Sequence, residues 1–461
     1  MTKPSVALAG LLLVAAGPAL AETFPGDTPR LTEGAAAAGI QHEYTGDWEF
    51  FVGGGAASFD CNGDRMPDLF LAGGTSPAQL YINRSEAAGT LTFEAAPVLK
   101  SGKAITKATG AYPIDLNNDG HQDLVVLRLG SNRILLGEGD CLFNDANKAL
   151  GFDGGRAWTT SFSAIWEEGE TFPTLAFGNY VDRRAPGSPF GTCEDNRLVR
   201  PASSDSDLPD YSQSTPLSPS HCTLSMLFSD WEGERQFDLR VTNDRQYHRG
   251  GQEQLWRIEA GQPPREYDES DGWEELVIWG MGIAQADLDA DGRPEYALTS
   301  MGDTKVQKLS EDAFENEPIY EDVAFDAGLT AHRPYTGDTS KPSTGWHAQF
   351  ADVNNDSWSD LFIAKGNVEA MPRLLIRTTC CLGRLQVPLP SKAMWPGSLW
   401  TAKGAARCSR ISTPTVSSTC WWSTGAQTSA CLKTKARLRL LRRNRLSATS
   451  CASNSTTAAS M

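Results

Sequence analysis

The sequence, 461 residues long, lacks the signatures of most enzymes and of membrane-spanning proteins. Only six histidines occur, and none has the paired spacing of a zinc protease; a serine nucleophile elbow and a phosphate-binding glycine loop are also absent. Beyond the N-terminus, no apolar run reaches the roughly 18 residues that a membrane-spanning helix needs. The sequence therefore indicates no catalytic function and no membrane span.

Acidic residues are missing from the end of the chain. All 57 acidic residues precede residue 373, whereas residues 373–461 contain 14 basic residues and six of the ten cysteines. The whole chain has a formal charge of −16, which disfavours nucleic acid as a partner and favours cations. Two compositions this different predict that the tail does not belong to the same evolved fold.

The basic tail has the character of a shifted reading frame. Re-reading the codons of residues 405–422 in the next frame permits an acidic loop followed by an apolar strand, at a distance after Asp352 where a further repeat is due. We place the shift near residues 371–377 and expect residues 373–461 to be disordered. The alternatives are a genuine basic, disordered tail or, less in keeping with an exported acidic protein, a nucleic-acid-binding arm built on Arg437, Arg439, Arg442 and Arg443.

The N-terminus has the pattern of an export signal. Lys3 precedes the apolar run from Val6 to Ala16, and Ala19-Leu20-Ala21 has the form that signal peptidase cleaves. The alternative is a short buried helix. Residues 1–21 are therefore interpreted as a signal peptide, which predicts a secreted, periplasmic or cell-surface protein in a compartment where disulfides persist.

One short acidic pattern recurs along the chain. It has a carboxylate or amide at positions 1, 3 and 5, usually glycine at position 6, and a carboxylate at position 9, followed by a β-branched or aromatic run. The strong copies are Asp60, Asn62, Asp64 and Asp68; Asp115, Asn117, Asp119 and Asp123; Asp287, Asp289, Asp291 and Glu295; and Asp352, Asn354, Asp356 and Asp360. A weaker copy with longer side chains, which could be a vestigial turn, comprises Asp230, Glu232, Glu234 and Asp238.

This pattern predicts calcium sites. Calcium takes six to eight oxygen ligands from flexible loops, and alternating side chains converge as the chain curls around the ion. Glycine at position 6 permits the sharp reversal with positive φ. The residues that follow read as strands rather than helices, so the loop joins a hairpin and is not an EF-hand. A single copy would be weak, because Asp, Asn and Gly are common in turns, but four copies in one setting predict several bound calcium ions.

The spacing of the copies predicts an all-β fold, a β-propeller. The distance from Asp60 to Asp115 is 55 residues, and the intervals ending at Asp287 and Asp352 are 57 and 65. A degenerate unit fits near residues 177–182. Repeats of this length with several short strands each are typical of propeller blades, so residues 22–372 are expected to form about six blades. An array of two-sheet sandwiches is the alternative.

Four cysteines precede the tail. Cys193 and Cys222 flank residues 186–220, which are rich in Pro, Ser and Asp and are interpreted as an insertion into the repeat. We predict a disulfide between these two cysteines. Cys61 and Cys141 could form a second, although Cys61 lies inside a proposed metal loop. The insertion could be a recognition loop or a tolerated surface excursion.

The sequence resembles FG-GAP/VCBS repeats, which build the propeller of the integrin α-subunit head. The resemblance rests on the acidic loops, on Leu80-Tyr81-Ile82-Asn83, and on Gly89 to Phe93 between two loops. Gly345-Trp346-His347-Ala348 looks most like bacterial members of the ASPIC/UnbV, cartilage-acidic-protein-like group. The resemblance covers about residues 51–372 and implies a seven-bladed, calcium-loaded extracellular propeller whose metal ligands are the loop residues named above.

These observations lead to one functional prediction and two alternatives. We expect an exported, calcium-binding, non-enzymatic propeller that serves adhesion or binds a protein or glycan ligand, with no nucleic-acid partner. The first alternative is an enzyme, a lyase or hydrolase that works in the central channel with the assistance of calcium. The second is a non-functional frameshift product. Propeller specificity lies in loops without shared spacing, so the sequence names neither the ligand nor an oligomeric state.

Overall fold

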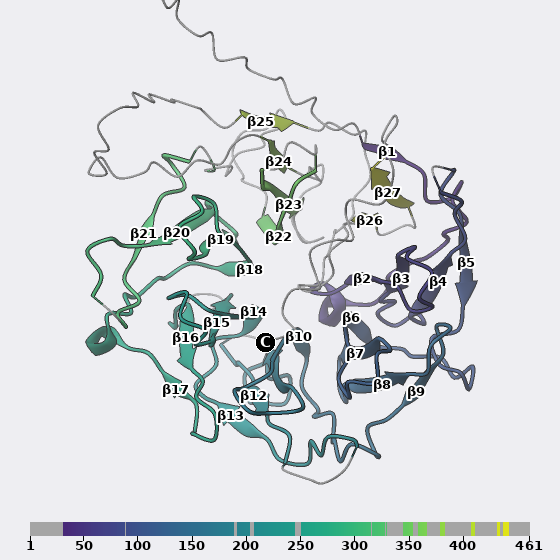
Figure 1. Cartoon of the computed structure of the whole chain (residues 1–461), viewed down its shortest axis with the longest axis horizontal. Coiled ribbons are helices and arrows are strands. Elements are labelled where there is room, and N and C mark those ends of the chain that lie inside the picture. The colour runs from purple at the N-terminus through teal and green to yellow at the C-terminus, as the bar shows by residue number, and fades with distance from the viewer. Residues whose placement is uncertain are drawn as a thin grey trace, which may run out of the picture.

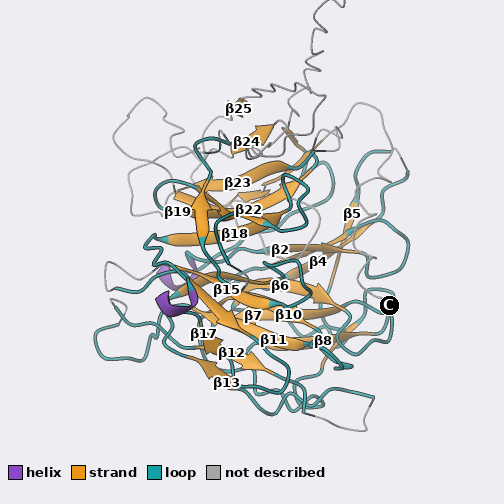
Figure 2. Ribbon diagram, turned by 60° about the vertical axis from the view of Figure 1, so that its left-hand side comes forward, coloured by secondary structure: helices purple, strands orange, loops and turns teal. Residues whose placement is uncertain are grey.

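The protein is a ring of antiparallel β-sheets around a central axis (Figure 1). A side view shows strands throughout and only two short helical segments among the described residues, the 3-10 helices η1 (Trp48–Phe50) and η2 (Glu269–Asp271) (Figure 2). No helix in the described part of the chain has the length and apolar character needed to cross a membrane. The computed structural model describes residues 31–87, 89–188, 191–202, 207–244, 250–314, 316–327, 329, 344–353, 358–366, 379–382, 407–410, 431–433 and 437–441.

Six blades of four strands each make up the ring, and within each blade the strands follow in sequence order from the axis to the rim. The first two blades contain β2 (Ala56–Phe59), β3 (Asp68–Leu71), β4 (Gln79–Asn83) and β5 (Phe93–Ala96), and then β6 (Ala108–Ile114), β7 (Asp123–Arg128), β8 (Arg133–Gly137) and β9 (Phe143–Asp145). The third and fourth contain β10 (Thr159–Ile165), β11 (Thr174–Asn179), β12 (Asn196–Val199) and β13 (Thr215–Leu217), and then β14 (Thr223–Ser229), β15 (Asp238–Asn243), β16 (Gln254–Arg257) and β17 (Arg265–Glu266). The fifth and sixth contain β18 (Gly280–Ala286), β19 (Glu295–Ser300), β20 (Lys305–Leu309) and β21 (Tyr320–Asp322), and then β22 (Thr344–Ala351), β23 (Asp360–Gly366), β24 (Thr379–Leu382) and β25 (Arg407–Arg410). The predicted all-β propeller with about six blades is confirmed.

The hydrophobic core lies between neighbouring blades. One cluster joins Phe70 and Leu80 of the first blade to Leu124 and Phe143 of the second, all 0–1% exposed. Because each sheet is covered on both faces by its neighbours, the second strand of a blade is apolar on both sides; β3 and β7 show this in their burial. The continuous apolar runs after each acidic loop are therefore explained by two-sided packing.

The inner strands approach each other closely at the axis. A Cβ added to Gly282 of β18 would lie 2.1 Å from the carbonyl oxygen of Trp346 on β22. Glycine is required there because the two backbones leave no room for a side chain. The same end of the ring is filled by a cluster that includes Phe50, Trp158, Tyr180 and Trp346. Trp346 and the adjacent His347 are buried, 4% and 6% exposed, so they pack within the ring.

The segment interpreted as an insertion is part of the third blade. Residues 186–220 contain β12 and β13, which pair with each other and, through β12, with β11. The prediction of an insertion is therefore wrong for these two strands. The sequence concealed them because they are only four and three residues long, Asn-Arg-Leu-Val and Thr-Pro-Leu, and are separated by polar connections with no alternating pattern.

Four short strands lie in the basic tail, which was expected to be disordered. β24 and β25 complete the sixth blade, so the expected propeller boundary at residue 372 falls inside that blade. β26 (Cys431–Lys433) and β27 (Arg437–Leu441) join β1 (Leu31–Glu33) in a three-stranded sheet, which lies between the sixth and first blades (Figure 1). Pairing to an open sheet edge uses backbone N–H and C=O groups and so does not need an apolar sequence. The proposed signal peptide, residues 1–21, and the proposed frame change, residues 371–377, lie outside the described residues.

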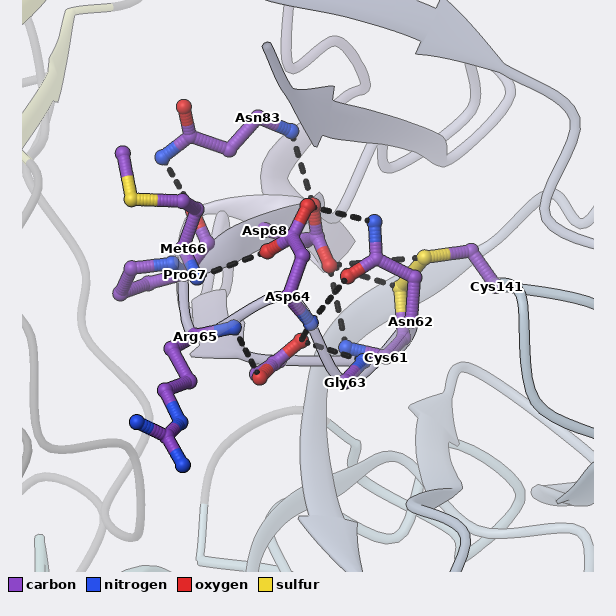
Figure 3. The surroundings of a disulfide bond; sticks show 11 residues. Cys61, Asn62, Gly63, Asp64, Arg65, Met66, Pro67, Asp68, Asn83 and Cys141 are labelled. Atoms are coloured by element: carbon purple, nitrogen blue, oxygen red, sulfur yellow. Dashed lines mark hydrogen bonds between the residues drawn. A yellow bond between two sulfur atoms is a disulfide. The ribbon is translucent and has the colours of Figure 1, made fainter. Parts of the chain in front are cut away.

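Two disulfides join neighbouring blades. Cys61, in the β2–β3 hairpin, is bonded to Cys141, in the β8–β9 turn of the next blade (Figure 3). Cys193, between β11 and β12, is bonded to Cys222, which precedes β14. The Cys141 N–H also donates to the Cys61 carbonyl, at 3.1 Å. Each crosslink therefore fixes one blade against its neighbour.

Removal of the first crosslink is predicted to destabilise the ring. The Cys61–Cys141 disulfide spans 80 residues, and closing a loop of that size is worth about 4 kcal/mol in the chain-entropy treatment. We expect the double variant Cys61→Ala/Cys141→Ala to lose stability of that order in urea unfolding, and reductant to lower its stability less than that of the parent. Equal stability of variant and parent without reductant would contradict the crosslink.

Candidate metal-binding loops

The acidic loops occupy the same place in each blade, the hairpin between the first and second strands. The four strong copies lie in the β2–β3, β6–β7, β18–β19 and β22–β23 hairpins, and the weaker copy lies in the β14–β15 hairpin. Because every blade runs in the same direction from the axis, these hairpins all lie on one face of the ring. Asn354 and Asp356 of the last strong copy lie outside the described residues.

The loops share one backbone conformation. In the four loops that are described throughout, the residues at positions 4 and 6 both have a positive φ. They are Gly63 and Arg65, Asn118 and Gly120, Gly233 and Arg235, and Ala290 and Gly292. The sequence predicted a left-handed residue only at position 6. Arg65 and Arg235 adopt that conformation without being glycine, which costs roughly 1–2 kcal/mol at each position, so the rest of the loop must hold them there.

The position 1 carboxylate closes the loop. Asp60 accepts hydrogen bonds from the N–H groups of Gly63, Asp64 and Arg65 at 2.8, 3.2 and 2.7 Å. Asp115, Asp230 and Asp287 cap their loops in the same way, through the N–H groups at positions 5 and 6. This capping turns the chain so that the side chains at positions 3 and 5 come together.

In the fifth blade the carboxylate oxygens of the loop converge on one centre, whereas in the first and second blades the side chains at positions 3 and 5 are in contact. The Asn62 side-chain amide donates to Asp64, and that of Asn117 donates to Asp119, both at 2.8 Å. Ligand atoms of Asp287, Asp289 and Glu295 all lie within 4.8 Å of one another. A set of carboxylate and amide oxygens on a flexible loop fits a hard cation such as calcium, so the residues present are suited to the ion that the sequence predicts.

The position 9 carboxylate is buried and joins the loop to the third strand. Asp68 accepts from the N–H groups of Cys61 at 3.0 Å and Asn83 at 2.8 Å, and Asp123 accepts from those of Leu116 and Gly137, both at 2.8 Å. These carboxylates are 0–1% exposed in five blades, at Asp68, Asp123, Asp238, Glu295 and Asp360. The sequence identified them only as metal ligands; their burial and structural hydrogen bonds follow from the fold.

Burial and mutual repulsion disfavour the charged form of these carboxylates. Desolvation raises the pKa of Asp68 to about 6 and that of Asp123 to about 7, against the lowering effect of their backbone N–H donors. The other loop carboxylates raise both values further; for Asp123 these are Asp115 and Asp119. Desolvation likewise raises the pKa of Glu295 to about 7. A cation in the loop would relieve this cost.

The weaker copy has its oxygens occupied by protein donors. Asp238 accepts from the indole N–H of Trp231 at 2.9 Å, the hydroxyl of Tyr267 at 2.7 Å and the N–H of Ile258 at 3.1 Å. Glu232 accepts from the N–H of Asn316. This loop therefore keeps the backbone of the others but does not present an open set of ligands.

The third blade replaces the acidic loop with an ion pair, which sequence reasoning missed. Thr174 stands at position 9, and its hydroxyl donates to Glu167, whose side chain is only 6% exposed. The guanidinium of Arg200, which follows β12, lies 2.7 Å from the same carboxylate. The sequence carried no signal for this pair, because Arg200 is 33 residues away from Glu167.

A pH dependence of stability follows for the metal-free protein. Because their pKa values are raised, these carboxylates bind more protons in the native state than in the unfolded state between about pH 4 and pH 7. Their contribution to the free energy of unfolding is therefore complete below about pH 4 and is lost as the pH rises through about 7. In urea unfolding with EDTA present, the contribution of these carboxylates to the free energy of unfolding should therefore fall as the pH rises over that range. Asp123→Asn should flatten the profile, whereas Asp140→Asn, at an exposed position in the β8–β9 turn, should not. Identical profiles for both variants would contradict this prediction.

Comparison with known proteins gives one family match. Residues 60–126 match the model of the FG-GAP-like repeat, from the first acidic loop to the strand after the second. No curated protein sequence matched the chain. Solved structures with a similar fold include a lectin from Agrocybe aegerita that recognises non-reducing terminal N-acetylglucosamine (12% identity, 71% of this chain and 77% of that chain, TM-score 0.36).

Two further structures show the same kind of likeness. One is BBS1N in complex with ARL6DN (10% identity, 88% of this chain and 99% of that chain, TM-score 0.42). The other is the Tc holotoxin pore of Photorhabdus luminescens (12% identity, TM-score 0.30), in which 73% of this chain aligns with only 16% of that chain. The six four-stranded blades show that the chain is a β-propeller, and the family match shows an FG-GAP-like repeat over residues 60–126 of it.

Proposed function

We propose that the chain is an exported calcium-binding β-propeller that serves as a non-enzymatic adhesion or ligand-binding module. The observation that carries this proposal is the repetition of one loop backbone, closed by the position 1 carboxylate and followed by a buried position 9 carboxylate, at the same hairpin of the first, second, fourth and fifth blades. A chance acidic turn would not recur with the same two left-handed residues and the same buried carboxylate.

Calcium would act here as a structural ion. When bound, it supplies positive charge that offsets the repulsion between the carboxylates at positions 1, 5 and 9. The position 9 carboxylate also holds the third strand through its backbone hydrogen bond. Calcium in a loop therefore stiffens three strands of a blade, which suits a module that presents a fixed surface to a partner.

The face opposite the loops has features of a binding surface. The cluster around Trp158 lies where the inner strands begin, whereas the loops lie where those strands end. Trp48 packs edge-on against Trp158, with ring centroids 5.5 Å apart, and remains 48% exposed. An exposed indole backed by a rigid aromatic cluster suits a sugar ring or an apolar side chain of a protein, so we propose a glycan or protein ligand at this face.

Calcium is expected to stabilise the protein. At an affinity typical of extracellular modules, about 10⁻⁴ M, roughly 10 mM calcium would contribute about 2.7 kcal/mol for each filled site. Thermal unfolding in calcium should exceed that in EDTA by several degrees, with a smaller effect of magnesium. Asp115→Asn/Asp119→Asn should reduce the shift, whereas Asp312→Asn, at an exposed position outside the loops, should not. Equal melting temperatures in calcium and EDTA would refute the calcium part of the proposal.

Ligand binding is tested at the aromatic face. We expect the purified protein to bind members of a glycan array or of a panel of extracellular proteins, and Trp48→Ala to weaken that binding by about ten-fold or more at an unchanged melting temperature. Trp166→Ala is the matched control, because Trp166 is 42% exposed in the β10–β11 hairpin on the loop face. Equal losses in the two variants would place the ligand elsewhere.

A further inference from the structure

One register position of the third strand can be followed through all six blades. The second residue of the second strand pairs with a third-strand residue, and the residue after that one lies on the loop side of the pair. In the first two blades the pairs are Leu69 with Tyr81 and Leu124 with Leu135, so the loop-side residues are Ile82 and Leu136. In the third to fifth blades the loop-side residues are Arg200, Arg257 and Lys308, and in the sixth the residue is Leu382.

The residue at this register position is apolar in some blades and basic in others. Ile82 and Leu136 pack against the hydrophobic clusters of their blades and bring no charge to the loop. The third, fourth and fifth blades instead carry a positive side chain at the equivalent position. Because the loops are rich in carboxylates, such a side chain is a cation supplied by the protein itself.

The fifth blade shows this arrangement most clearly. The Lys308 ammonium contacts the carboxylate of Asp289 and lies 4.0 Å from that of Asp291. The side chains of Lys308 and Asp289 are 12% and 3% exposed, so the pair is largely shielded from solvent. Lys308 is also within electrostatic reach of Glu295. The ammonium therefore lies among three of the four predicted ligands.

In the third blade, an arginine takes the place of Lys308 and contacts a carboxylate of the hairpin. The Arg200 guanidinium lies 2.7 Å from Glu167 in the hairpin, and it also donates to the carbonyl of Glu259 in the next blade at 2.8 Å. In the fourth blade, Arg257 pairs with Glu259 at 2.6 Å and lies within electrostatic reach of Asp238 and Glu232. In all three blades the cation comes from the same register position.

We propose that the ring contains two classes of loop: resident-cation loops in the third, fourth and fifth blades, whose charge is balanced by Arg200, Arg257 and Lys308, and open loops in the first and second blades, which take calcium. This inference rests on the proposed calcium-binding function. It separates the loop of Asp287, Asp289, Asp291 and Glu295 from the strong copies of the first two blades, although its sequence pattern is complete. Lys308 repels a divalent ion and occupies a carboxylate that the ion would need.

Calorimetric titration of the full-length protein with calcium chloride tests the inference. Lys308→Met should add one calcium site to the number measured for the parent, or tighten the weakest site by about ten-fold or more. Lys305→Met is the matched control, because Lys305 lies on the same strand and pairs with Asp322 rather than with the loop. If the parent binds no calcium, the proposed function fails; if the parent binds calcium and the two variants behave alike, the resident cation is refuted.

The reciprocal change tests the open class. Ile82→Lys places an ammonium at the same register position in the first blade, and it should remove one calcium site while narrowing the difference in melting temperature between calcium and EDTA. Ile82→Met keeps the side chain apolar and should preserve the parent's number of sites. Should Ile82→Lys fold, as judged by circular dichroism, and retain every site, the register position does not control calcium binding.

Discussion

The hydrogen-bonded carboxylate at the start of the second strand is the interaction on which each blade depends. In five blades it is withdrawn almost completely from solvent, and in the first two it accepts one N–H from the loop and one from the third strand. A single acidic residue thereby fixes the hairpin and the strand beside it. The third blade substitutes the hydroxyl of Thr174 and the carboxylate of Glu167, which preserves an oxygen acceptor at the same place.

Burying such a carboxylate in its charged form is electrostatically unfavourable, and the rest of the loop adds to this cost. Further acidic side chains at positions 1 and 5, and at position 3 in the fourth and fifth blades, surround it, and the low local polarity strengthens their repulsion. The geometry is compatible with two ways of balancing this negative charge, a bound divalent ion or a basic side chain from the third strand. Position 2 of the loop is independent of this choice, since it points between blades and is filled by Leu116, Trp231, Leu288 or the disulfide-bonded Cys61.

The repeat could be predicted from the sequence, but the differences between individual blades could not. The periodic acidic loops and apolar runs predicted the blades, because those features belong to residues close together in the chain. Arg200 and Lys308 were missed because they reach their partners through strand register, which a local pattern does not show. β12 and β13 were missed because short, mixed-polarity strands gain their order from the sheet they join, and β24 and β25 pair through backbone groups that any sequence supplies.

The two loop classes occupy separate stretches of the ring. The resident-cation blades are the third, fourth and fifth, and the open blades are the first and second, of which the first lies beside the sheet of β1, β26 and β27 (Figure 1). Because each blade contacts mainly its neighbours, stability is passed along the ring one interface at a time. Calcium would then act chiefly on the first two blades, while the third to fifth blades keep their charge balance without metal. In a propeller arranged in this way, calcium would set the rigidity of the blades with open loops rather than that of the whole ring.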